Sequence, residues 1–289
     1  MKRGSSVTKH SSYIETINDD EYCYAVSSIF VEAFAKLFHI SGEEMLFPDT
    51  LTTPFGLFLQ QGDVIRDFWL DINETPKSLI FWPDEIWSKY ANNLKDLTYE
   101  ENSENAIRCL NEMVTNALAY VGDCVEFLSR FRNPSTFRFF AILQVVTFGD
   151  LALCYNNIQV FRTGIKTSEG LMAKVFVQTK TMEDVYGALY DFSSILRSKV
   201  DMNDPNAETT ISRIEAVQKL CRDSGTLIKW KSYIIQSQSS HNQALVTLFF
   251  FDIVHFHNPL RTGIPQSTTE HNWFNILRNK IIDSYIEHY

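Results

Sequence analysis

A helical pattern of apolar residues between positions 107 and 128 constrains the fold more than any other feature of this sequence. Apolar side chains recur there at steps of three and four, which places them on one stripe of a long helix. The stripe consists of Ile107, Leu110, Val114, Ala117, Leu118, Val121, Val125 and Leu128. Further segments with helical periodicity lie at about 20–38, 54–73, 135–155, 183–199 and 208–222. No segment alternates convincingly as a strand does, so the sequence predicts an all-α protein.

Polar residues mark the expected ends of the helix that carries this stripe. Asn102 or Ser103 can cap its start, and the Asn133–Pro134 pair is expected to end it. The residues after about Cys221 are mixed, polar and weakly periodic. We therefore expect a polar leader at 1–17, a helical domain at 18–225 and a C-terminal tail of different character at 226–289.

Composition and charge restrict the classes of function. Hydrophobic residues make up 45% of the 289 residues, enough for a real core. The 35 acidic residues outnumber the 26 basic ones, which argues against nucleic acid as a partner because phosphate binding needs clustered Lys and Arg. Five scattered cysteines indicate reduced thiols in a cytosolic setting. No stretch is expected to span a bilayer, and the apolar run at 244–251 is expected to be buried or interfacial.

An acidic stripe on the helix expected at 54–73 is the most informative local feature. At 100° per residue, Asp67 and Asp71 lie about 40° apart, and Asp63 and Glu74 fall within the same sector. Like charges one turn apart repel, and Arg66 is expected to point about 100° away from them. A magnesium ion would relieve the repulsion, since it takes one or two carboxylates and leaves positions for water and phosphate. A solvated acidic face is the alternative.

The segments that surround this stripe resemble squalene synthases, especially those of plants. The resemblance runs nearly in register from about residue 14 to 225. It is carried by EYCYAVSS, GLFLQ, VIRDFWLDINETPKS, FWPDEIWSKY, CLNEMVTNALAYV, FRFFAILQ, LALCYNNIQVFR and TMEDVYGALYDFSS. It implies an isoprenoid-synthase-type helical bundle around a central cavity.

The resemblance also implies an activity and a place in the cell. Two molecules of farnesyl diphosphate would couple head to head to presqualene diphosphate, with Mg²⁺ assisting the departure of pyrophosphate. Reduction by NADPH would then yield squalene for sterol and triterpene biosynthesis. The family implies the cytosolic face of the endoplasmic reticulum and association with a membrane surface.

Individual positions match functional residues of the family. Asp67 and Asp71 match the outer aspartates of its second Asp-rich motif, which hold magnesium. Tyr22 matches a tyrosine proposed as base and cation stabiliser, and Gln60 a glutamine that lines the cavity; a buried packing tyrosine is the alternative for Tyr22. The remaining matches are Phe137 and Phe139, as aromatic residues near the second half-reaction, and Arg66 and Lys166, as contacts to pyrophosphate or to the NADPH phosphate. Simple packing is the alternative for the phenylalanines and a solvated side chain for Lys166.

Several positions depart from the family pattern. The family has Glu at Leu70, Lys-Thr-Asn at 61–63 and Arg at Ser168. Its first Asp-rich motif is expected to lie upstream of Met1, so that the chain would lack the N-terminal helices of the fold. We therefore expect impaired activity. The alternative is a non-catalytic protein that binds prenyl diphosphate or modulates an intact squalene synthase as its partner.

Overall fold

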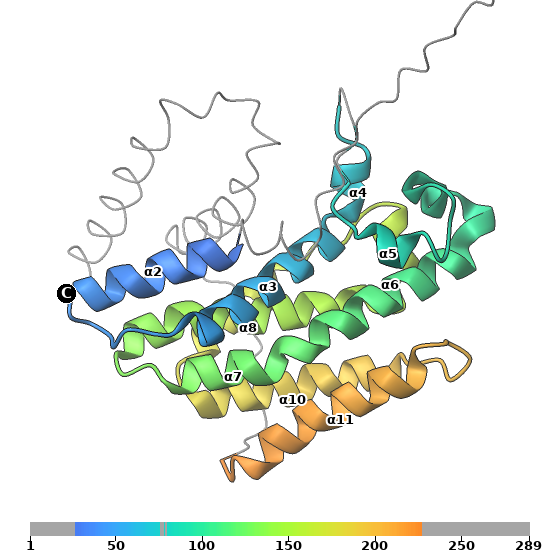
Figure 1. The fold of residues 1–289 in the computed structure, drawn as a ribbon. Helices are drawn as coiled ribbons and strands as arrows, with labels where there is room; N and C mark the ends of the chain where they lie inside the picture. The colour runs from blue at the N-terminus through green and yellow to red at the C-terminus, as the bar shows by residue number, and fades with distance from the viewer. Residues whose placement is uncertain (1–26, 76–77, 79, 227–289) are drawn as a thin grey trace, which may run out of the picture. The chain divides into compact units, whose positions relative to one another are not determined.

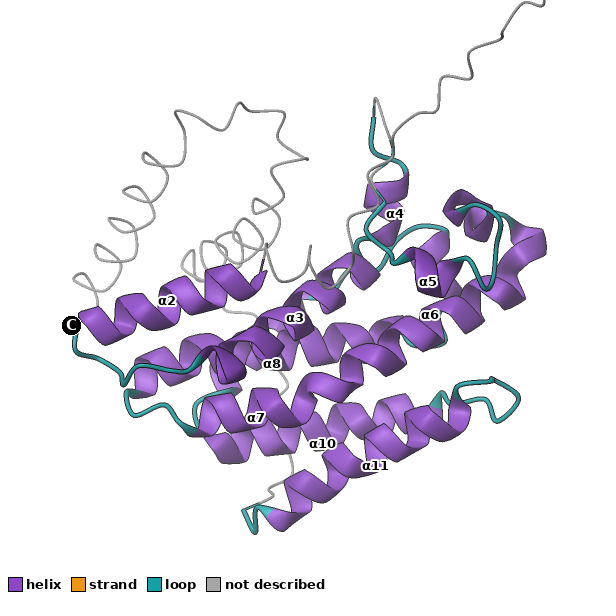
Figure 2. Ribbon diagram, viewed as in Figure 1, coloured by secondary structure: helices purple, strands orange, loops and turns teal. Residues whose placement is uncertain are grey.

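The computed structural model describes residues 27–75, 78 and 80–226. Within these residues all regular structure is helical and no strand occurs (Figure 2). The α-helices are α2 (Ile29–Ile40), α3 (Asp49–Arg66), α4 (Phe68–Ile72), α5 (Asp84–Trp87), α6 (Ser103–Ala117), α7 (Val121–Ser129), α8 (Pro134–Cys154), α9 (Glu169–Gln178), α10 (Met182–Ser198) and α11 (Ala207–Asp223). Short 3₁₀ helices are η2 (Leu94–Thr98), η3 (Glu100–Asn102), η4 (Leu118–Tyr120) and η5 (Ile158–Phe161). The predicted all-α class is confirmed.

The predicted helix bounds agree best with the observed ones where a single helical pattern has clear ends. The segments expected at 135–155, 183–199 and 208–222 correspond to α8, α10 and α11 within one residue at each end. The helix expected across 107–128 is instead divided into α6 and α7 by the 3₁₀ turn η4. The helix expected at 54–73 begins earlier, at Asp49, and is divided into α3 and α4 at Asp67. Residues 20–26 lie outside the described part of the chain.

Asn133 has a different role from the one expected. Its side-chain oxygen accepts a hydrogen bond from the backbone N–H of Ser135 at 2.7 Å, and Pro134 occupies the first position of α8. This arrangement is an N-cap followed by proline at the first helical position, where the missing N–H costs nothing. Asn133 therefore starts α8, whereas the expectation was that it ends the preceding helix. Asn102 precedes α6 without a side-chain cap.

Helix α3 lies at the centre of the described structure (Figure 1). It packs against α2, α6, α7 and α8, while α10 packs between α8 and α11. Phenylalanines fill the space between α3, α7 and α8, where the rings of Phe55, Phe127 and Phe140 have centroids 5.0–5.7 Å apart. Edge-to-face and tilted pairs at this spacing are the favoured aromatic geometry. This cluster fixes the end of α3 opposite to the acidic stripe.

Helix α8 is long and apolar enough to cross a membrane by length and composition, although no such segment was expected from the sequence. The greater part of its most apolar stretch is buried among the other described helices. Such burial is typical of the central helix of a globular core.

Close contact between α3 and α8 requires a residue without a side chain at Gly62. A Cβ atom added there would overlap with Cγ2 of Thr147 on α8. We expect Gly62→Ala to lower the free energy of unfolding by about 1–3 kcal/mol in a urea titration, because the overpacked helices must separate. Thr147→Ser in the same chain removes the clashing methyl group and should restore most of the loss. Gly122→Ala on α7 is the control, because an added Cβ there would lie within 4 Å of no heavy atom beyond the local backbone of its own helix, and an equal response of both glycines would contradict this account.

Glu44 holds the N-terminus of α8 from the segment between α2 and α3. Its buried carboxylate accepts hydrogen bonds from the backbone N–H groups of Arg132 at 3.0 Å and Asn133 at 2.7 Å, and from the hydroxyl of Thr136. A carboxylate at a helix N-terminus also interacts favourably with the helix dipole.

We expect Glu44→Gln to lower the free energy of unfolding by about 1.5–3 kcal/mol, because hydrogen bonds to a charged acceptor are lost and an amide N–H₂ faces backbone donors. Chemical denaturation monitored by far-UV circular dichroism measures the change. Glu126→Gln, at an exposed ion pair with Arg130, should cost less than about 1 kcal/mol. Equal losses at both positions would show that the buried carboxylate of Glu44 contributes no more to the free energy of unfolding than an exposed ion pair does.

Candidate functional site

The acidic stripe lies where α3 passes into α4. Asp67 ends α3 with φ −90° and ψ 4°, and its carbonyl oxygen accepts from the N–H groups of Leu70 at 2.9 Å and Asp71 at 3.0 Å. The bond to Asp71 keeps the two aspartates one turn apart despite the interruption of the helix. Their side chains are buried, with Asp67 3% and Asp71 5% exposed, whereas Glu74 is exposed. Asp67 and Asp71 therefore form a buried pair, and Leu70 between them is 54% exposed.

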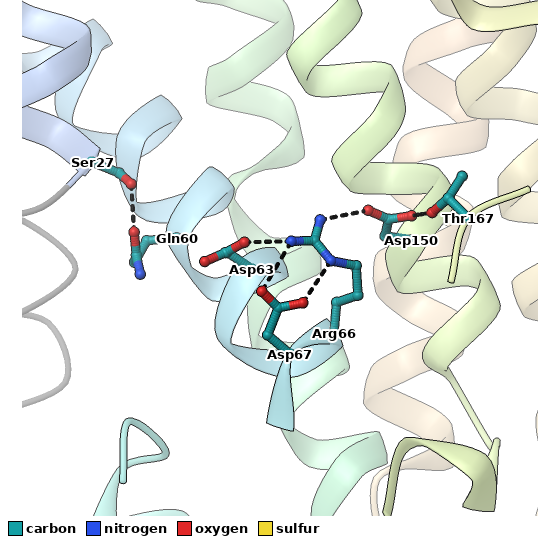
Figure 3. A network of polar contacts seen from close by, with 7 residues as sticks. All are labelled: Ser27, Gln60, Asp63, Arg66, Asp67, Asp150 and Thr167. Atoms are coloured by element: carbon teal, nitrogen blue, oxygen red, sulfur yellow. Dashed lines mark hydrogen bonds and ion pairs between the residues drawn. The ribbon is translucent and has the colours of Figure 1, made fainter. Parts of the chain in front are cut away.

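Arg66 forms the centre of a network of carboxylates (Figure 3). Its Nε donates to Oδ1 of Asp67 at 2.9 Å, and its Nη2 to Oδ2 of Asp67 at 3.3 Å and to Oδ1 of Asp63 at 2.5 Å. Its Nη1 donates to Oδ2 of Asp150 on α8 at 3.1 Å. The expectation that Arg66 points away from the stripe is wrong, because its long side chain lets the guanidinium reach Asp63 and Asp67.

The charge balance of this network is uneven. Three carboxylates surround one guanidinium, so the formal charge is −3 + 1 = −2. Burial lowers the pKa of Arg66, but the three carboxylates outweigh burial and hold the pKa well above its ordinary value. Arg66 therefore stays charged at any accessible pH.

Asp150 and Thr167 also belong to the network, and neither is among the site residues predicted from the sequence. Asp150 is 1% exposed, and its Oδ1 accepts a hydrogen bond from the hydroxyl of Thr167. Figure 3 shows Thr167 on the far side of Asp150 from Arg66. A signal was present in the sequence, because Asp150 is the only acidic residue of the 21-residue helix α8. A single carboxylate in an apolar helix indicates a buried ion pair, since burial of an unpaired charge is costly.

The other predicted site residues lie in different surroundings. Gln60 is buried, and its Oε1 accepts from the hydroxyl of Ser27 at 2.6 Å, which joins α3 to the residues just before α2. Phe137 is buried, while Phe139 is half-buried and stacks on Phe34 of α2 with centroids 5.6 Å apart. Lys166 is exposed between η5 and α9.

The structure thus brings together only part of the predicted set. Arg66, Asp67 and Asp71 lie where α3 passes into α4, whereas Phe137 and Phe139 lie near the opposite end of α8 from Asp150. At 1.5 Å per residue, that separation along α8 is about 16–20 Å. Tyr22 lies outside the described residues.

The buried pair fits a magnesium ion only in part. Carboxylate oxygens are the ligands that Mg²⁺ prefers, and one or two of them suffice where phosphate and water complete the octahedron. Both oxygens of Asp67 already accept from Arg66, and the described residues contain no group of three His, Cys, Asp or Glu side chains placed to hold a metal. A metal at this position would therefore depend on ligands from a bound phosphate.

The chain matches one family over much of its length. Residues 6–169 match the model described as squalene/phytoene synthase. Squalene synthase 1 of Panax ginseng is 55% identical over 252 residues, which cover 86% of this chain and 61% of that protein. Squalene synthase of Solanum lycopersicum is 52% identical with the same coverage. The chain thus spans about three fifths of the length of these relatives.

The solved structure of TcSQS in complex with the ligand BPH1237 has the same fold. It superposes with a TM-score of 0.68 and 33% sequence identity, over 71% of this chain and 61% of the TcSQS chain. The sequence and structural likenesses agree, and the chain belongs to the squalene/phytoene synthase family. The predicted family and its helical fold are therefore confirmed.

Proposed function

We propose that this chain binds farnesyl diphosphate with Mg²⁺ at Asp67 and Asp71 and serves in the head-to-head coupling that leads to squalene. The observation that carries the proposal is the buried pair of carboxylates one turn apart at the junction of α3 and α4, in a member of this family. Bound Mg²⁺ would neutralise the charge that develops on the departing diphosphate. Presqualene diphosphate is the proposed first product, and NADPH the proposed reductant for the second step.

Arg66 has a narrower role in this proposal than the family match implies. Four of its five N–H groups already donate to carboxylates, which leaves at most the second N–H of Nη1 for a phosphate oxygen. The two parallel bonds to Asp67 fix the orientation of that carboxylate. Arg66 thus orients Asp67, and Lys166, which is exposed, is left to meet a phosphate of the substrate or of NADPH.

Aromatic side chains supply the second requirement of this chemistry. Carbocations survive only where water is excluded and aromatic faces are near. Phe137 and Phe139 lie in the phenylalanine-rich end of the bundle, where Phe139 contacts Phe34, Phe38 and Phe140. We propose that the prenyl chains extend from the acidic end of α3 toward these rings. By family membership, we place the protein at the cytosolic face of the endoplasmic reticulum, in contact with the membrane surface.

A second candidate function is supported by the charge of the site. Three carboxylates gather around Arg66, where they would repel a diphosphate, and Leu70 is a largely exposed apolar residue where the family carries a carboxylate. Both observations favour a non-catalytic protein that binds prenyl diphosphate weakly or modulates an intact squalene synthase.

Incubation of the purified full chain with farnesyl diphosphate and Mg²⁺, with and without NADPH, separates the two candidates. Mass spectrometry should detect presqualene diphosphate without NADPH and squalene with it, and Asp67→Asn or chelation of Mg²⁺ should abolish both products. Binding of farnesyl diphosphate without any product would leave the non-catalytic function. Neither binding nor product, from a protein with a native circular dichroism spectrum, would contradict both.

A further inference from the structure

We propose that Asp150 is a positioning residue that holds both cationic residues of the proposed diphosphate site, Arg66 directly and Lys166 through Thr167. The inference rests on the proposed function, because that function assigns Arg66 to the orientation of Asp67 and Lys166 to contact with a phosphate. It also has a structural consequence that can be measured without any ligand.

The two carboxylate oxygens of Asp150 bind different partners. Oδ2 accepts from Nη1 of Arg66 at 3.1 Å, and Oδ1 accepts from the hydroxyl of Thr167 (Figure 3). Arg66 is 84 residues away in sequence and Thr167 is 17 residues away, so one buried carboxylate joins two distant segments to α8. A buried carboxylate with a charged partner is held rigidly, since each lost hydrogen bond leaves an unpaired polar group.

The backbone around Lys166 is held by contacts of the residues on either side of it. Thr167 is fixed by Asp150, and Gly164 packs against α4, where an added Cβ would lie 3.4 Å from Cβ of Trp69. Gly164 has φ +74°, a conformation that other residues rarely adopt. Ser168, which follows Thr167, caps α9: its hydroxyl oxygen accepts a hydrogen bond from the N–H of Leu171 at 3.2 Å. The backbone of Lys166 is thus held on both sides while its side chain stays exposed.

Thr167 is a better position than Asp150 for testing this inference by substitution. Asp150→Asn would remove one of the negative charges that oppose a diphosphate, and it would also weaken the hold on Arg66, so its two effects on binding have opposite signs. Thr167→Val removes only the hydroxyl donor and leaves the charges intact. Thr167→Ser keeps the donor and is the conservative rescue. Thr163→Val is the matched control, because the exposed Thr163 hydroxyl bonds to Gln159 and to the carbonyl oxygen of Gly164 and not to Asp150.

The experiment measures amide hydrogen exchange of residues 163–168 and the affinity for inorganic diphosphate with Mg²⁺ by calorimetry, in the full chain. We expect Thr167→Val to accelerate exchange in this segment roughly 10-fold and to weaken diphosphate binding roughly 5-fold, with no comparable change in the global unfolding midpoint. Thr167→Ser and Thr163→Val should behave like the parent protein. Bound diphosphate should slow exchange of this segment in the parent protein but not in Thr167→Val.

Three results would count against the inference. Parental exchange in Thr167→Val, or equal acceleration in Thr163→Val, would show that Asp150 does not hold the segment. Accelerated exchange with parental diphosphate affinity would show that the contact is structural only. If the parent protein binds no diphosphate, the proposed function and the ligand role of Asp150 both fail, while the exchange pattern still decides whether Asp150 holds the segment.

Discussion

Arg66→Gln is expected to lower the free energy of unfolding by about 3–5 kcal/mol, the largest stability change we predict for a single substitution. The substitution removes the guanidinium from among three buried or nearly buried carboxylates, whose side chains are 2–12% exposed. An uncompensated buried charge is far more costly than a lost surface pair. Urea denaturation of the full chain, monitored by circular dichroism, provides the measurement.

Two further variants make the origin of this loss specific. Adding Asp63→Asn and Asp150→Asn to Arg66→Gln removes two of the three carboxylate charges that faced Arg66, and we expect it to recover more than half of the lost stability. Arg130→Gln, at a pair with both side chains more than half exposed, should cost less than about 1 kcal/mol. Failure of the triple variant to recover stability would show that Arg66 acts through packing of its side chain and not through charge.

The stabilising effect of added Mg²⁺ should also distinguish Arg66→Gln from the parent protein. A divalent cation that binds the folded state stabilises it according to its affinity and concentration. In Arg66→Gln the carboxylates have lost their internal cation, so we expect added Mg²⁺ to raise the unfolding midpoint more than in the parent protein. An equal effect of Mg²⁺ on both proteins would show that these carboxylates do not attract the ion.

Asp71→Asn is expected to weaken Mg²⁺-dependent binding of diphosphate, and any turnover of farnesyl diphosphate, by roughly 100-fold or more. The amide has the same shape as the carboxylate but lacks its charge, so it cannot hold a hard divalent cation with comparable strength. Asp71 is chosen for this test because substitution of Asp67, which accepts hydrogen bonds from Arg66 with both oxygens, would disturb the network around Arg66.

Calorimetry with inorganic diphosphate at several Mg²⁺ concentrations measures the effect on binding, and product formation measures the effect on turnover. Asp49→Asn is the control, because Asp49 lies on the same helix α3 but is exposed at its N-terminus. If Asp71→Asn binds diphosphate as Asp49→Asn does, the buried pair is not the metal site. Restoration of binding at higher Mg²⁺ would instead support a weakened metal contact.

The sequence alone determined the class of fold, most of the long helices and the family. Apolar residues at steps of three and four report which face of a helix is buried, and this local property suffices to place α8, α10 and α11. The same periodicity did not predict the divisions at η4 and at Asp67, because apolar spacing is nearly unchanged when one turn tightens or loosens. The acidic stripe was visible for the same local reason, since Asp67 and Asp71 are separated by one turn.

Only the tertiary structure decided which distant groups meet. Arg66 and Asp150 are 84 residues apart, and Glu44 is 88–92 residues from the groups it binds at the start of α8. Neither pairing follows from spacing along the chain, because it depends on the angle and distance at which α3 packs on α8. That approach is possible only because Gly62 has no side chain. Helical periodicity records local hydrogen bonding and burial, whereas the partners of a buried charge are chosen by the packing of whole helices.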